Sequence, residues 1–328
     1  MLRCELPGRE PSLKPKSVTI LGPQRLRPNL IEAVRAHGVT GRIATVTAGW
    51  QEREDEDREL HEHLERRTVN LRLYHRAEAL FAADPELRDV LRERQTRLQE
   101  QQRLYRLRLG FALQAARELL AVSGDPSLLE VQRASAVQAV QALDEQHLEQ
   151  VVEINAGYEE QLRIQDRAPV AAGRRELETL LSETSAVAIA GGHVAVLLNR
   201  LRLFGLEWLL RGKDLFSWSA GAMACSDRVV LFHDSPPQGA GDPEVLEAGL
   251  GLFPDLVPLP HARHRLRLYD RDRVALFAQR FAPALCVALD EECRIEWDGR
   301  RWRGLPPTTH LTPEGSLEEF EAVAGEEE

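Results

Sequence analysis

The chain has 328 residues, enough for one large domain or two of ordinary size, and 43% of them are hydrophobic, which is enough to fill a core. Its net charge of −10 and its pI near 5.6 disfavour attraction to nucleic acid or to an anionic membrane. We therefore expect a globular protein that binds neither. Arginine is far commoner than lysine, which is typical of proteins from GC-rich bacterial genomes.

Residues 1–51 have the pattern of a βαβ unit. An apolar run at 17–22 ends in Gly-Pro, residues 30–37 have helical periodicity, and 41–49 form a second apolar run. Strand, helix and strand in succession imply a parallel sheet, so this segment is predicted to begin an α/β domain.

Residues 52–168 are rich in Leu, Glu, Gln, Arg and Ala, and poor in Gly and Pro. Apolar residues recur at helical intervals from 87 to 119, stop at Asp125-Pro126, and resume from 131 to 162. The pattern predicts a helical hairpin or small bundle inserted into the α/β domain. A leucine stripe of this kind more often faces a core than a partner.

Helices and strands alternate again over residues 169–305, which are predicted to complete the α/β domain. The Asp298-Gly299 pair between β-type runs predicts a hairpin turn. Residues 306–328 lose periodicity and end in Glu-rich sequence, so we expect an acidic, flexible tail. The strands predicted in the main part lie at 186–190, 215–218, 229–232 and 284–289.

The segment Ser217–Ala222 follows a predicted strand and precedes small residues that can start a helix. This is the setting of a nucleophile elbow, a tight turn that projects its central residue, here Ser219, from the carboxyl edge of the sheet. The amide of Ala220 would then help to hold an oxyanion. The alternative is an ordinary helix start that carries an inert serine.

Gly191 and Gly192 follow the buried strand at 186–190 and lie at the same sheet edge, where open α/β folds bind ligands. Their backbone would approach a substrate and donate to an oxyanion, although an ordinary strand-to-helix turn is the alternative. A serine nucleophile also needs a base. Ten histidines are available, so residue types alone do not select one.

Together these features resemble the dipeptidase E and cyanophycinase family of serine peptidases, within the class I glutamine amidotransferase-like superfamily. The resemblance is close over residues 185–304 and loose over the opening βαβ unit. It implies an α/β, mostly parallel, flavodoxin-like three-layer sandwich, interrupted here by the long α-helical insertion. The residues that carry it are Gly191-Gly192, Ser219–Ala222, Gly249–Leu252, His261 with Arg265 and Arg267, Ala288–Glu291 and Gly304.

By position, the resemblance implies Ser219 as nucleophile and His261 as base. The third member in such enzymes is an acid between them, and Asp234 occupies the comparable place after the strand at 229–232. This chain departs from the family pattern in having Ser217 at the usual elbow glycine. The rival residues are Asp227 for the acid and His233 and His264 for the base.

The resemblance also implies an oxyanion hole formed by Gly191, Gly192 and Ala220. The glycine loop departs from the family in having Ala190 and His193, and His193 is a candidate for substrate binding. Family members often act on Asp-containing peptides. Arginines at alternate positions after His261 would suit such a substrate by binding its carboxylate, or they make structural ion pairs; the candidates are Arg263, Arg265 and Arg267.

The expected function is a serine peptidase-like amide hydrolase that acts on a small or acidic peptide and works as a homodimer. A glutamine amidotransferase would need cysteine where Ser219 stands. The alternative is an inactive relative that serves as a binding or assembly module through its helical insertion.

No cofactor or metal is expected. The four cysteines, Cys4, Cys225, Cys286 and Cys293, are scattered and lack zinc-site spacing. Residues 1–17 contain no apolar stretch typical of a signal peptide, and no later run approaches the ~20 apolar residues of a membrane span, so a cytoplasmic protein is expected.

Overall fold

The computed structural model describes residues 14–234, 241–321 and 323–324. Its centre is an eight-stranded sheet. The strands of this sheet are β1 (Ser17–Leu21), β2 (Arg42–Val46), β3 (Thr68–Asn70), β4 (Thr184–Ile189), β5 (Asp214–Trp218), β10 (Arg294–Trp297), β11 (Arg301–Leu305) and β14 (Val323–Ala324).

The strand order is β14-β11-β10-β1-β5-β4-β2-β3. Every pair from β1 to β3 is parallel, and β10, β11 and β14 add an antiparallel edge. The hairpin predicted at Asp298-Gly299 joins β10 and β11. The structure confirms the predicted α/β class with a mostly parallel sheet.

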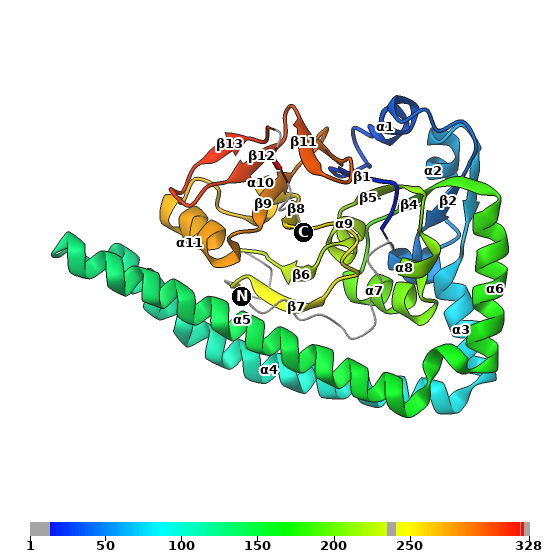
Figure 1. Ribbon diagram of the computed structural model, residues 1–328, viewed down its shortest axis with the longest axis horizontal. Helices are drawn as coiled ribbons and strands as arrows, with labels where there is room; N and C mark the ends of the chain where they lie inside the picture. Colours follow the sequence, from blue (N-terminus) through cyan, green and yellow to red (C-terminus); the bar gives the residue numbers. More distant parts are fainter. Residues whose placement is uncertain (1–13, 235–240, 322, 325–328) are drawn as a thin grey trace.

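Helices cover both faces of this sheet (Figure 1). Side chains alternate along β4, so that Ala186 and Ala188 join one buried cluster while Val187 and Ile189 join the other. The first cluster includes residues of α1, and the second includes residues of α3, α6 and α7. The helices and 3-10 turns of the α/β part are α1 (Leu30–Ala36), η1 (Ala48–Arg53), α2 (Arg58–His63), α3 (Leu73–Ala83), η2 (Ile164–Asp166), α6 (Ala168–Ser182), α7 (Val194–Leu203), α8 (Leu206–Leu209), α9 (Ala220–Cys225), α10 (Ala262–Arg265) and α11 (Arg271–Phe281).

Two smaller sheets complete the α/β part. One has the order β13-β12-β9-β8, and in it β8 and β9 are parallel neighbours. The residues that directly follow these two strands, His261 and Asp290, are therefore at the same edge. The strands of the smaller sheets are β8 (Leu256–Pro260), β9 (Leu285–Leu289), β12 (Thr309–Leu311), β13 (Leu317–Glu319), and the antiparallel pair β6 (Arg228–Leu231) and β7 (Glu244–Ala248).

The last segment differs from the expected flexible tail. Residues 309–319 form β12 and β13, and β12 pairs with β9. Thr308 and Phe320 are buried, and the backbone of Phe320 packs against Gly304, where a Cβ would lie 2.0 Å from the Phe320 carbonyl oxygen. Burial of these side chains outweighs the acidic composition.

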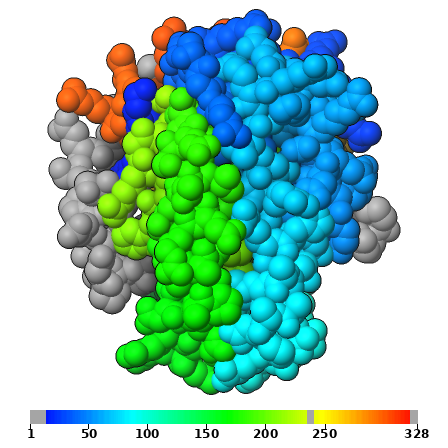
Figure 2. All heavy atoms as spheres, turned by 90° about the vertical axis from the view of Figure 1, so that its right-hand side faces the viewer, coloured from blue at the N-terminus to red at the C-terminus, as the bar shows by residue number. Residues whose placement is uncertain are grey.

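The helical segment is a long hairpin of α4 (Pro85–Ala121) and α5 (Pro126–Leu162), as predicted from the break at Asp125-Pro126. Each helix has 37 residues, which is about 55 Å. Figure 1 shows the free end of the hairpin projecting beyond α11, and Figure 2 shows its cyan and green helices side by side below the α/β part. The range 52–168 expected to be helical also contains β3, a three-residue edge strand too short to give a sequence signal.

Buried polar contacts fix the hairpin to the α/β part. At its base, Asp84 caps α4 and binds the Arg167 guanidinium at 2.6 and 2.7 Å. Halfway along, Asp144 of α5 binds Arg280 of α11 at 2.6 and 2.8 Å, and both side chains are 2% exposed. The hydroxyl of Tyr105 in α4 donates to Asp144 at 2.6 Å. The insertion is therefore anchored at two distant points.

Candidate active site

Ser219 lies between β5 and α9, with φ 51° and ψ −124°. A residue other than glycine in this conformation carries about 1–3 kcal/mol of strain, which persists only when the surroundings impose it. The surroundings here are tightly packed, because a Cβ on Gly221 would lie 2.3 Å from the carbonyl oxygen of Ile189. Ser219 is partly exposed. The strand, the strained serine and the following helix have the geometry expected of a nucleophile elbow.

The glycine loop after β4 lies directly beside this elbow. A Cβ on Gly191 would be 2.7 Å from Cβ of Ser219 and 3.4 Å from the amide nitrogen of Ala220. Gly192 has φ +120°. Within the described part of the chain, the amides of Gly191, Gly192 and Ala220 donate no hydrogen bond. Free N–H groups on the glycine loop and at the start of α9, beside the serine, can stabilise an oxyanion.

His261 follows β8, and α9, which begins after Ser219, packs against β8. Its amide donates to the carbonyl of Leu289 at 3.0 Å, and its ring is partly exposed. Burial lowers the pKa of His261, the charge of Arg265 lowers it further, and Asp290 acts in the opposite direction. A neutral imidazole, the form that accepts a proton, is therefore favoured.

The structure does not join Ser219, His261 and Asp234 by hydrogen bonds. Among the residues described, neither the Ser219 hydroxyl nor the His261 ring makes one. Catalytic hydrogen bonds often tighten only when substrate binds, so the missing hydrogen bond between Ser219 and His261 is compatible with catalysis. Asp234, in contrast, is held by contacts that do not include His261.

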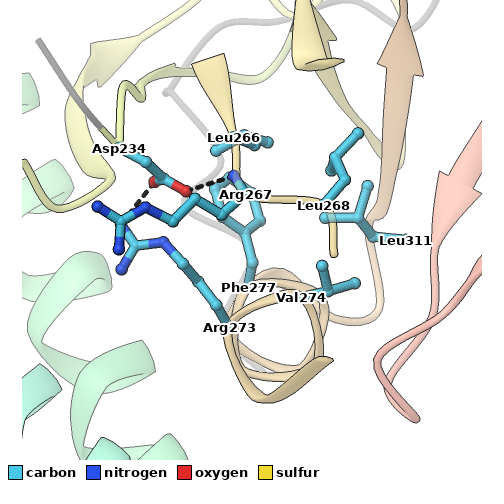
Figure 3. Close-up of a pocket in the computed structure, with 8 residues that line it drawn as sticks. All are labelled: Asp234, Leu266, Arg267, Leu268, Arg273, Val274, Phe277 and Leu311. Atoms are coloured by element: carbon cyan, nitrogen blue, oxygen red, sulfur yellow. Dashed lines mark hydrogen bonds and ion pairs between the residues drawn. The ribbon is translucent and has the colours of Figure 1, made fainter. Parts of the chain in front are cut away.

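Both carboxylate oxygens of Asp234 are bound elsewhere (Figure 3). One accepts from the Arg273 guanidinium of α11 at 2.5 Å, and the other accepts from the amide of Arg267 at 2.7 Å. The side chain is 2% exposed, and its charge is not among those that act on His261. Asp234 thus holds the segment after α10 against α11 and does not orient the imidazole.

Two acids that sequence reasoning left without a role lie closer to the base. Asp290 and Glu291 follow β9, and their carboxylates are the ones whose charges act on His261. Asp290 accepts from the amide of Arg263 at 3.1 Å, and burial raises its pKa. The signal that could have found them is their position directly after a predicted strand, which is shared by Asp234.

The candidate substrate-binding residues have defined contacts. His193 caps α7 by accepting from the amide of Val196 at 3.3 Å, and its side chain is exposed. The Arg263 side chain is 71% exposed, with Nε 3.6 Å from Asp290. Arg265 lies over the ring of Phe232 at 5.9 Å from its centroid. Arg263 and Arg267 are thus exposed, whereas Arg265 is partly buried.

The alternatives for the acid and the base lie outside the elbow and the glycine loop. Asp227 is exposed in the turn before β6, His233 follows β6, and His264 is exposed on α10. Cys225 is fully buried, which raises its pKa to about 12, so it is a protonated core thiol. Cys4 lies outside the described residues.

Within the described ranges, no group of three or more His, Cys, Asp or Glu side chains is arranged to hold a metal ion. None of the described helices is both long and apolar enough to cross a membrane.

The model of Peptidase family S51 matches residues 139–304, a range that contains the glycine loop, Ser219, His261 and the two acids after β9. A search of curated proteins found no match to the chain. Among solved structures, the chain is similar to that of a peptidase from an acI-B1 Actinobacterium, with 13% identity, 96% of this chain and 98% of the other covered, and a TM-score of 0.41. That likeness is too weak to carry a functional argument.

Proposed function

The chain belongs to peptidase family S51, and from this premise we propose that it is a serine peptidase in which Ser219 attacks the carbonyl carbon of a peptide bond. His261 takes the hydroxyl proton and passes it to the leaving amine, and water then hydrolyses the acyl-enzyme. The amides of Gly192 and Ala220 hold the oxyanion. The observation that carries the proposal is the strained Ser219 beside free amides of the glycine loop.

In this proposal, the carboxylate that orients His261 belongs to Asp290 or to Glu291. β8 and β9 are parallel neighbours, so these acids and His261 leave the sheet side by side. The proposal gives Asp234 no part in this role, because Arg273 and Arg267 bind its oxygens. The substrate is a peptide, and the exposed guanidinium of Arg263 is placed to bind an acidic group on it.

Single substitutions distinguish these acids. Asp290→Asn or Glu291→Gln is expected to lower kcat on acidic dipeptides and blocked peptides by about 10³–10⁴-fold, because an imidazole without its acid adopts the wrong tautomer. Asp234→Asn should leave kcat within a few-fold while lowering the unfolding temperature. Steady-state kinetics and thermal unfolding provide both readouts. A loss of kcat confined to Asp234→Asn in folded protein would overturn this assignment.

One observation favours a second function, assembly through the insertion. The outward face of α4 exposes three apolar side chains at a heptad-like spacing, Leu104 (45%), Leu107 (60%) and Phe111 (71%). These residues were expected to belong to the core stripe, but that stripe is provided by others, including Leu109 and Leu113. We name Leu104, Leu107 and Phe111 the α4 seam.

The occupant that we propose for the α4 seam is a second copy of the chain. Exposed residues of opposite charge lie beyond its two ends, Arg97 on one side and Glu118 on the other. In an antiparallel pair of α4 helices with Leu104 opposite Phe111, the residues whose numbers sum to 215 face each other, so Arg97 lies opposite Glu118 at both ends and Leu107 lies opposite Arg108. Two-fold symmetry repeats the apolar pair and the charged pair, so each of them is made twice in the dimer.

Light scattering after size exclusion tests this assembly. The wild type is expected at twice the chain mass of 37.0 kDa, and Phe111→Glu at the mass of one chain, because it buries a charge against Leu104 of the second copy. Leu128→Glu, at an equally exposed position of α5 outside the seam, is the matched control and should remain a dimer. A monomeric wild type would contradict the proposal.

A further inference from the structure

A second strained residue lies at the same sheet edge as the nucleophile. Gln51, in η1 after β2, has φ 60° and ψ −126°, close to the 51° and −124° of Ser219. Glycine adopts this conformation without steric cost, whereas glutamine does not. Contacts with the surrounding residues must therefore hold Gln51 in this conformation.

The structural cause is the anchoring of the loop that contains Gln51. The buried carboxylate of Glu54 accepts from the amides of Tyr74 and His75 at 3.0 and 2.9 Å, at the start of α3. The carbonyl of Glu54 accepts from the Thr47 hydroxyl at 2.9 Å and from the Asn70 side chain at 3.1 Å. These contacts fix both ends of the turn at 47–54.

The same loop packs against the glycine loop of the active site. The amide of His193 donates to the carbonyl of Gly49 at 2.8 Å, and a Cβ on Gly192 would lie 2.3 Å from that carbonyl oxygen. The order β5-β4-β2 separates the Ser219 and Gln51 loops by two strand spacings, which is about 10 Å. An extended peptide rises about 3.4 Å per residue, so it covers this distance in about three residues.

The side chain of Gln51 is available for binding. It is partly exposed, and its carboxamide makes no hydrogen bond within the described part of the chain. A carboxamide both donates and accepts, which matches the N–H and C=O groups of an extended peptide backbone.

We infer that Gln51 binds the backbone of a peptide substrate about three residues from the cleaved bond, so that peptides of at least four residues, which reach Gln51, are bound more tightly than shorter ones. The inference rests on the proposed serine peptidase function and adds a preference for longer peptides to it. Gln51 contacts substrate and takes no part in proton transfer.

The test compares wild type and Gln51→Gly on a series of blocked peptides from two to six residues. We expect kcat/KM of the variant to fall about tenfold on the longer peptides, mainly through KM, and to stay unchanged on dipeptides. Gln51→Asn, which keeps an amide but shortens its reach, should show the same pattern. The thermal stability of Gln51→Gly should equal or exceed that of wild type, because strain is relieved.

Arg66→Gly is the matched control. Arg66 also has positive φ (59°) and is exposed, but it lies after α2, so its replacement should leave kcat/KM unchanged at every length. An equal loss on all lengths, no loss on any, or a wild type that cleaves only dipeptides would overturn the inference. Fluorophosphonate labelling separates the two hypotheses: a labelled wild type with no length effect refutes the role of Gln51 alone, whereas an unlabelled, inactive wild type refutes the peptidase itself.

Discussion

Replacing Ser219 with alanine is expected to lower kcat by about 10⁴–10⁶-fold and to abolish covalent labelling by a fluorophosphonate. Only the hydroxyl is removed, and alanine keeps the Cβ that packs against Gly191 and the same strained backbone. The protein should therefore remain folded while the covalent step is lost. Steady-state kinetics, active-site labelling and circular dichroism on one preparation measure all three properties.

Ser185→Ala is the control for this experiment. Ser185 is exposed near the start of β4, at the opposite edge of the sheet from the elbow, and its replacement should leave labelling intact. Labelling that persists in folded Ser219→Ala would place the nucleophile elsewhere and reject the proposed mechanism.

Asp144→Ala is expected to destabilise the protein by about 3–5 kcal/mol, because it leaves the buried guanidinium of Arg280 without its partner. It also removes the acceptor of the Tyr105 hydroxyl. A loss of this size in a chain of 328 residues lowers the unfolding temperature by on the order of 5 °C. Differential scanning calorimetry at neutral pH is the measurement.

Two further variants test whether the loss of stability comes from the unpaired buried charge. Glu145→Ala, at the exposed neighbouring position, should change stability by less than about 0.5 kcal/mol. The double variant Asp144→Leu with Arg280→Met should recover much of the loss, because no buried charge remains. If Asp144→Ala were as stable as Glu145→Ala, the buried pair would not be an anchor of the hairpin.

The elbow and the hairpin were predictable because their signals are local. Small residues after a strand define the turn at Ser219, and aspartate-proline pairs mark the starts of α4 and α5, where Asp84 and Asp125 cap the helices. The long series of apolar residues at helical intervals then predicted that both segments are α-helices. None of these signals depends on contacts between distant residues.

The acid of the site was not predictable in the same way. Asp234 and Asp290 both follow strands, so local sequence does not distinguish them. What separates them is tertiary: α11 places Arg273 on Asp234, and the parallel pairing of β8 with β9 places Asp290 near His261. Similarly, β12 is recognisable only through its pairing with β9, because three residues carry no periodicity.

The position of β1 at the middle of the sheet also sets an order of events during synthesis. Its parallel partner β5 lies roughly 200 residues further along the chain, and β10 lies further still. At about 5–20 residues per second, a ribosome needs about 10–40 s to travel from β1 to β5. The helical hairpin pairs within residues 85–162 and is available to form in that interval, so β1, the first of the described strands to be synthesised, is among the last to acquire its neighbours.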